Sequence, residues 1–126
     1  MRTIAERAPN RTIVLTGDIH SNWVNELHVS DTPTDGPGVA AEFVTTSISS
    51  GGDGSDSWSG VNERTLPENP HVRWHSNRRG YITCDVAADS WISDFREVPY
   101  VSRPGAPVTS ASKWRVAWGE AGIDRA

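Results

Sequence analysis

The segment Thr12–Trp23, TIVLTGDIHSNW, constrains the fold of this 126-residue chain more than any other. Three apolar residues, Ile13–Leu15, stand in a row between threonines, and the run ends at Gly17. A short apolar run without polar alternation is typical of a strand buried on both faces, as in the sheet of an α/β protein. Asp18 and His20 follow directly. The pattern therefore predicts a buried strand that carries a carboxylate and an imidazole at its end.

The rest of the sequence is rich in strand patterns and poor in helix patterns. We expect one or two helical turns over residues 61–68, and loops over the segments 30–38 and 49–60, which are rich in glycine, proline and polar residues. Further strands are expected over residues 23–29, 41–48, 71–77, 80–86, 91–98 and 114–118. The predicted fold class is thus α/β in a β-rich form, mostly strands with one short helix.

Alternation along the later strands predicts which side chains face inward. Ile82, Cys84 and Val86 share one face, so Cys84 is expected to be a buried apolar residue. Because it is the only cysteine, the sequence excludes an internal disulfide and a thiolate zinc site. The six tryptophans are spread over separate segments, which favours packing within the sheet over a platform for stacking bases.

Composition narrows the class of protein. The length suits one domain with a modest core, and 36% hydrophobic with 22% charged residues predicts a folded chain. A formal net charge of −4 argues against a general nucleic-acid-binding surface. No apolar run approaches the roughly 20 residues that cross a bilayer, and residues 1–10 lack the apolar core of a signal peptide.

The strand at residues 13–15 raises a packing problem. A strand that is apolar on both faces needs a covering layer on each side, and a chain with so little helix cannot easily supply both. We therefore expect the chain to be a fragment or one half of an assembly. An exposed apolar surface along residues 12–16 is expected wherever the covering layer is missing.

Asp18 and His20 allow two interpretations from their chemistry alone. Carboxylate oxygen and imidazole nitrogen are good ligands for hard or borderline metal ions, and side chains two residues apart can point to one side of an extended backbone. Gly17 would let the backbone pass close by. The same residues also commonly cap a turn without any ligand. The motif G-D-x-H leaves both interpretations open.

Four longer motifs resemble a known family. The segments TIVLTGDIHSNW, EFVTTSISSGGDG, NPHVRWHSNRRGY and DFREVPYVSRPGAPV occur in the order and at the spacing of the alkaline phosphatase D (PhoD-like) family. The likeness runs from about Arg11 to Val108 and corresponds to the C-terminal part of that family's catalytic domain. It implies a two-sheet αββα sandwich of the calcineurin-like superfamily, of which residues 1–126 would be the C-terminal portion.

The resemblance also implies a function. Such enzymes are exported metal-dependent phosphatases that act on phosphomonoesters and phosphodiesters, with iron and calcium at a shared centre. Gly17-Asp18-Ile19-His20 stands where calcineurin-like enzymes carry their last metal motif, so the resemblance makes Asp18 and His20 metal ligands. The family's upstream ligand motifs have no counterpart in this sequence. No catalytic residue is identified here, and the missing N-terminal half becomes the expected partner.

Three histidines and an arginine pair have a functional and a structural interpretation. His28, His71 and His75 are candidate ligands, but surface or hydrogen-bonded histidines are commoner. The pair Arg78 and Arg79 could bind phosphate through bidentate hydrogen bonds. A solvated hairpin corner is the commoner setting for two adjacent arginines, so we expect that structural role.

The segment around Glu42 is the last candidate. Its serines Ser47, Ser49 and Ser50 precede two glycines, and such a loop could contact a substrate phosphate through backbone N–H groups. It could equally be a turn that needs glycine. No G-x-S-x-G motif surrounds these serines, which argues against a serine nucleophile.

Two functions therefore remain. The chain is the C-terminal part of a PhoD-like phosphatase, which is inactive alone and acts on a phosphoester within the intact enzyme. Alternatively, it is a non-catalytic β-rich binding or interaction module that derives from the same fold.

Overall fold

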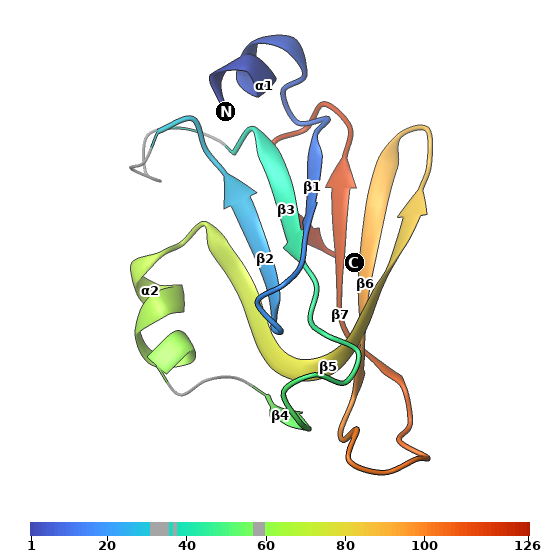
Figure 1. Ribbon diagram of the computed structural model, residues 1–126. Coiled ribbons are helices and arrows are strands. Elements are labelled where there is room, and N and C mark those ends of the chain that lie inside the picture. Colours follow the sequence, from blue (N-terminus) through green and yellow to red (C-terminus); the bar gives the residue numbers. More distant parts are fainter. Residues whose placement is uncertain (31–35, 37, 57–59) are drawn as a thin grey trace.

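The computed structural model describes residues 1–30, 36, 38–56 and 60–126. The described chain is rich in strands, with two short α-helices and one π-helical turn. In chain order the elements are α1 Arg2–Arg7, β1 Ile13–Thr16, β2 Asn22–Leu27, β3 Ala40–Val44, β4 Gly54–Ser55, the π-helical turn Val61–Thr65, α2 Leu66–Glu68, β5 Val72–Val86, β6 Ser90–Val98, β7 Thr109–Ala117 and β8 Asp124–Arg125 (Figure 1).

The strands form one mixed sheet in the order β1-β3-β2-β5-β6-β7-β8, and β4 pairs separately with β5. β1 and β3 run parallel, with Ile13 beside Ala41 and Thr16 beside Val44. The other described pairs are antiparallel. This mixed, strand-rich sheet confirms the predicted α/β class. The parallel pair also brings the carboxyl ends of β1 and β3 to the same edge.

The core lies between two halves of this sheet. The first part of β5 pairs with β2, and its last part pairs with β6. Figure 1 shows β5 curving from one half to the other at the bottom of the view. Phe43 from β3 meets Phe95 from β6 with ring centroids 6.3 Å apart, and both are fully buried. Val24, Ala41, Trp114, Val116 and Ile123 complete the cluster, so the curved strand folds the sheet onto its own apolar face.

The curved strand corrects one prediction. The sequence indicated two strands, 71–77 and 80–86, with a hairpin corner at the arginine pair, but β5 runs through both without a turn. Gly80 permits this course, because a Cβ at that position would lie 1.9 Å from the carbonyl oxygen of Arg96. The missing side chain lets β5 and β6 approach closely where β5 bends.

Other elements agree with the sequence in type and differ in extent. The expected strands at 23–29 and 41–48 end earlier, at Leu27 and Val44, and the last long strand begins earlier, at Thr109. The expected helical turns over 61–68 are confirmed. The sequence patterns missed α1, β4 and β8. The expected loops at 30–38 and 49–60 fall partly outside the described residues, and so does Trp58.

Cys84 was expected to be buried, and this prediction is wrong because its side chain is exposed. Ile82, on the same face, packs against the core cluster, whereas Val86 is 62% exposed. The β5–β6 hairpin therefore extends beyond the core. Among the described tryptophans, those at 74, 91, 114 and 118 lie in or against the core, as expected.

The exposed apolar surface expected along residues 12–16 is present at one end of the sheet. Ile13 and Val14 are half-buried, and Leu15 is 56% exposed. Ile19 and Ile48, in the loops that follow β1 and β3, are 51% and 67% exposed. No helix of the described residues has the length and apolar character needed to cross a bilayer.

Candidate metal site at the carboxyl ends of β1 and β3

The loop after β1 has an unusual backbone conformation. Asp18 and His20 have φ angles of 75° and 60°, and the Ile19 N–H donates to the Gly17 carbonyl oxygen at 3.0 Å. That bond closes a γ-turn centred on Asp18, and a γ-turn with a positive central φ is rare and strained. Residues without glycine's freedom hold such angles only where the surroundings enforce them, often at functional sites. The backbone therefore marks this loop as a candidate site.

Both predicted ligands are accessible in this loop. The side chains of Asp18 and His20 are exposed, so a carboxylate and an imidazole are available to a ligand from outside the chain. Their donor atoms suit a hard or borderline metal ion. Across the described residues, no group of three or more histidine, cysteine, aspartate or glutamate side chains could hold a metal ion. Asp18 and His20 therefore belong to no group of three potential ligands within the described residues.

The loop after β3 lies beside the loop after β1. The Thr45 N–H donates to the Thr16 carbonyl oxygen at 2.9 Å, which continues the parallel pairing into the loops. The Ser47 hydroxyl donates to the Ser50 carbonyl oxygen at 2.7 Å. In an open α/β sheet, the carboxyl ends of parallel strands are where ligands bind. The two loops therefore form one edge that is open to a ligand.

A buried polar pair fixes the base of these loops. Asn22 accepts a hydrogen bond from the Thr46 N–H at 3.0 Å and donates to the Glu97 carboxylate at 2.7 Å. Glu97 is 8% exposed, and burial raises the pKa of its carboxyl against the opposing hydrogen bonds from Ser76 and Asn22. The sequence patterns did not predict this pair. The sequence signal for it is that Glu97, an acidic residue, lies on the same strand face as the apolar Phe95.

The arginine pair does not form a solvated corner. Arg79 is 2% exposed, and its guanidinium donates to the His20 carbonyl oxygen at 2.6 Å. Arg78 pairs with Asp56 at 2.9 Å and donates to the Pro99 carbonyl oxygen at 2.9 Å. The expected structural role as a hairpin corner is therefore wrong, because β5 continues through both residues and directs Arg79 inward.

The other three histidines, His28, His71 and His75, each contact another side chain. His75 is 4% exposed and lies against Trp23 with ring centroids 4.1 Å apart. Burial lowers the pKa of His75 to about 4. His28 lies 3.8 Å from the Glu26 carboxylate, and its ring meets the edge of His71 at 6.3 Å between centroids. Within the described residues, none of the three joins a group of potential metal ligands.

Glu42 binds neighbouring strands together. Its carboxylate oxygens accept hydrogen bonds from the Thr16 hydroxyl and the Asn25 amide, each at 2.8 Å. The polar segment that follows β3 is held at Asp53, whose carboxylate accepts from the Val101 N–H at 2.7 Å and the Ser102 N–H at 2.8 Å. Those backbone hydrogen bonds lower the pKa of Asp53. The Glu42 contacts are therefore structural ones.

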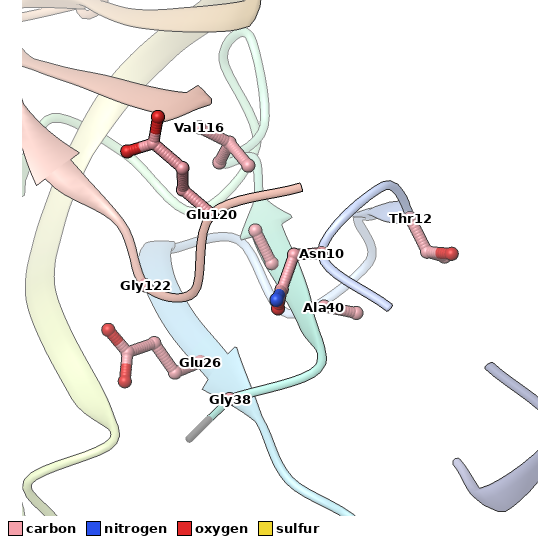
Figure 2. Close-up of a pocket in the computed structure, with 9 residues that line it drawn as sticks. Asn10, Thr12, Glu26, Gly38, Ala40, Val116, Glu120 and Gly122 are labelled. Atoms are coloured by element: carbon pink, nitrogen blue, oxygen red, sulfur yellow. The ribbon is translucent and has the colours of Figure 1, made fainter. Parts of the chain in front are cut away.

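A small cavity lies at the opposite end of β1. Figure 2 shows Gly122 between Glu26 and Glu120 in the view, with Asn10 and Thr12 nearby. The volume of about 10 Å³ corresponds to a single water molecule at most. A phosphoester does not fit in this cavity.

Comparisons with known proteins show the family of this chain. The model of the PhoD-like phosphatase family matches residues 1–95. The chain belongs to the PhoD-like phosphatase family. It is 40% identical to alkaline phosphatase D of Bacillus subtilis (strain 168) over 105 residues, which cover 83% of this chain and 18% of that protein.

A solved structure, described as the structure of PhoD, has the same fold. It superposes with a TM-score of 0.91 at 35% identity, covering 98% of this PhoD-like chain and 24% of that chain. The resemblance drawn from the four motifs is thus confirmed, and so is the strand-rich fold. The chain spans less than a quarter of the length of either relative.

Proposed function

We propose that this chain is the C-terminal part of the catalytic domain of a PhoD-like phosphatase that hydrolyses phosphomonoesters and phosphodiesters. One observation carries the proposal: Asp18 and His20 occupy an exposed, strained loop at the carboxyl ends of two parallel strands. A parallel pair that ends in ligand-type residues is typical of a site that binds something at the sheet edge.

In this proposal the Asp18 carboxylate and the His20 imidazole are metal ligands. The family resemblance suggests iron and calcium. When bound, such ions polarise a phosphoryl oxygen and supply hydroxide at neutral pH. The chain's own contribution is to present two donors in a fixed backbone conformation. No general acid or base is assigned to its residues.

The remaining ligands are proposed to come from the rest of a longer protein. The surface around Leu15, Ile19 and Ile48 is apolar and exposed, and it borders the candidate site. Large exposed apolar groups on a sheet edge favour a covering partner. We propose that the portion of the family's catalytic domain that this chain does not span covers β1 and completes the centre. Export is proposed from the same resemblance.

The non-catalytic alternative rests on a separate observation. The described residues offer two exposed donors in one loop, and no third donor joins them. Two side chains do not make a complete phosphatase centre. Under this alternative the chain keeps the fold as a self-contained binding module.

The test uses a chimeric enzyme. The matching 105-residue segment of the Bacillus subtilis alkaline phosphatase D is replaced by that of this chain, and Asp18→Ala and His20→Ala are introduced separately. Each change should lower kcat/KM by at least about 100-fold and lower the bound iron or calcium. Asp85→Ala, which alters an exposed carboxylate at the far end of β5, is the matched control and should change neither.

Two outcomes would overturn the proposal. Unchanged metal content and activity in both ligand variants would remove Asp18 and His20 from the centre. Turnover of p-nitrophenyl phosphate by the 126-residue chain alone, lost on His20→Ala, would show that the chain needs no further ligands. A self-contained module instead predicts an inactive chimera and a stable, dye-silent monomer for the chain alone.

A further inference from the structure

Arg79 joins the two loops of the candidate site. One terminal nitrogen, Nη1, donates to the His20 carbonyl oxygen at 2.6 Å. The same nitrogen reaches three acceptors of the loop after β3: the Ser47 hydroxyl at 3.1 Å, the Ser50 carbonyl oxygen at 3.2 Å and the Thr46 hydroxyl at 3.3 Å. The guanidinium therefore contacts both loops from a third element, β5.

The other terminal nitrogen anchors the guanidinium to its own strand. Nη2 donates to the carbonyl oxygen of Asn77 at 2.8 Å and to its side-chain oxygen at 3.0 Å. A planar guanidinium holds its donors in a rigid fork, so fixing one side orients the other. The bonds to Asn77 thus set the direction of the bonds to the two loops.

The surroundings of Arg79 leave little room for another arrangement. The side chain is 2% exposed, and no carboxylate pairs with it among the described residues. A buried charge is tolerated only when hydrogen bonds replace its hydration. Here carbonyl, hydroxyl and amide oxygens do so at both terminal nitrogens, while the buried Nε has no hydrogen-bond partner among the described residues. A Cβ at Gly51 would lie 3.8 Å from both Arg79 Nη1 and His20 Nδ1, so the imidazole lies close to the same point.

We infer that Arg79 is a positioning residue that enforces the left-handed backbone of His20 and so fixes the direction of both metal-ligating side chains. The inference rests on the proposed function of Asp18 and His20. A φ of 60° at a histidine needs an enforcing contact, and the hydrogen bond to its carbonyl oxygen supplies one. The same cation holds the loop after β3, so the two loops keep one relative position.

The adjacent arginine provides a matched control. Arg78 has the same chemistry, but it contacts Asp56 and the Pro99 carbonyl oxygen, and neither belongs to the loop after β1. Lysine keeps the positive charge and loses the fork, so it cannot hold several acceptors in one plane. Arg79→Lys and Arg78→Lys therefore test geometry at constant charge.

The experiment measures calcium affinity and steady-state kinetics in the chimeric enzyme. Arg79→Lys should weaken calcium binding about 10- to 100-fold and lower kcat with little change in KM, which is the expected range for an outer contact that orients a ligand. Arg78→Lys should leave both within about twofold of the parent. In the chain alone, Arg79→Lys should also speed amide exchange at Ile19, whose N–H closes the γ-turn, but not along β6.

The outcomes separate this inference from the proposed function. If Asp18→Ala and His20→Ala change neither metal content nor activity, the proposed function fails and the positioning role fails with it. If those variants lose metal while Arg79→Lys matches Arg78→Lys in calcium affinity, only the positioning role is wrong. Should Arg79→Lys unfold the enzyme, Ser47→Ala removes a single acceptor, and an unchanged calcium affinity there would overturn the inference.

Discussion

The two ends of the sheet are built differently. At one end, β1 exposes Leu15 and leads into the strained loop of Asp18 and His20. At the other end, β8 is two charged residues long, and the Arg125 guanidinium lies 4.8 Å from the Trp114 ring centroid. Short strands and charged side chains protect a sheet edge from pairing with other chains. The β8 end has that protection, and the β1 end has apolar groups in its place.

The exposed apolar groups make the β1 end of the sheet a candidate interface. The same core cluster supports both ends, because Phe43 of β3 packs against Phe95 of β6. The β1 edge is apolar, borders the candidate ligand loop and is attached to a well-packed core. Such an edge is typical of an interface.

The largest expected effect separates the core from the open end. Phe95→Ala removes a fully buried ring between the two halves of the sheet and should lower the free energy of unfolding by about 3–5 kcal/mol. Leu15→Ala, at a side chain that is 56% exposed, should change it by no more than about 0.5 kcal/mol. Urea unfolding of the 126-residue chain measures both.

The cost of Leu15→Ala should differ in the longer chimeric enzyme. If the rest of the catalytic domain covers β1, Leu15→Ala should cost about 2–5 kcal/mol there, because it then leaves a cavity in a packed interface. A hydrophobic dye should bind the chain alone and not the chimera. If Leu15→Ala lowers the free energy of unfolding equally in the chain alone and in the chimera, the rest of the domain does not cover the β1 end.

The second effect is a pH dependence beneath the open end, where His75 packs against Trp23. Burial lowers the folded pKa of His75 from 6.5 to about 4, so the unfolded chain binds more protons between these pH values. The free energy of unfolding should therefore fall as the pH drops from about 6.5 to 4, by at most about 3 kcal/mol. Unfolding measured across this range checks the slope.

Two variants test whether His75 causes this pH dependence of the free energy of unfolding. His75→Gln should remove the loss of stability between pH 6.5 and 4. Glu97 contributes with the opposite sign, because its folded pKa is raised from 4.5 and its contribution is lost as the pH rises. Glu97→Gln should therefore leave the acid-side loss in place. An identical slope in the parent and in His75→Gln would contradict the assignment.

The sequence predicted the features that depend on neighbouring residues. Asp18 and His20 stand out because an apolar run and a glycine precede them within one short segment. Alternation also placed Ile82 on an inward face, and Ile82 packs against the core cluster. The positive φ angle of His20 could not be predicted, since the hydrogen bond to its carbonyl oxygen comes from Arg79, which is far away in the sequence.

The errors have a common physical cause, which is the course of β5. Its continuity through Arg79 and Gly80 depends on a close approach to Arg96 in a strand that comes later in the chain. Local patterns suggested a corner there, so the bonds from Arg79 to the two loops were missed. Cys84 was placed inside because alternation gives the face of a strand but not how far the covering layer extends.

Two glycines that follow β3 differ in their surroundings: Gly52 lies in the loop, and Gly54 begins β4. Gly52 and Gly54 have φ angles of 74° and 71°, so alanine suffers the same backbone strain at each. A Cβ at Gly52 meets nothing within 4 Å, whereas one at Gly54 would lie 1.9 Å from the Asn77 carbonyl oxygen. Gly54→Ala should therefore destabilise the chain by about 1–3 kcal/mol more than Gly52→Ala.

Urea unfolding of the two variants gives the difference in their free energies of unfolding. The backbone strain cancels in this difference because both variants have it. Because Asn77 also orients Arg79, Gly54→Ala should speed amide exchange at Ile19, while Gly52→Ala should not. Equal stabilities would mean that β4 and β5 separate at little cost, and that the loop after β3 is not held against the sheet.

The smallest effect tests the protected end. Arg125→Ala removes a cation over the Trp114 ring and should cost about 0.5–1 kcal/mol, as for an exposed cation–π contact. Arg103→Ala is the matched control, because the Arg103 guanidinium lies 4.4 Å from the Tyr100 ring centroid in a loop outside the sheet.

Both variants lose a similar contact, but only Arg125 also pairs in register with Trp114 across β7 and β8. Arg125→Ala should therefore speed amide exchange near Trp114, and Arg103→Ala should not. If the two variants exchange alike along β7, the charged edge gives no protection, and the contrast between the two ends of the sheet rests on the exposed apolar groups of β1 alone.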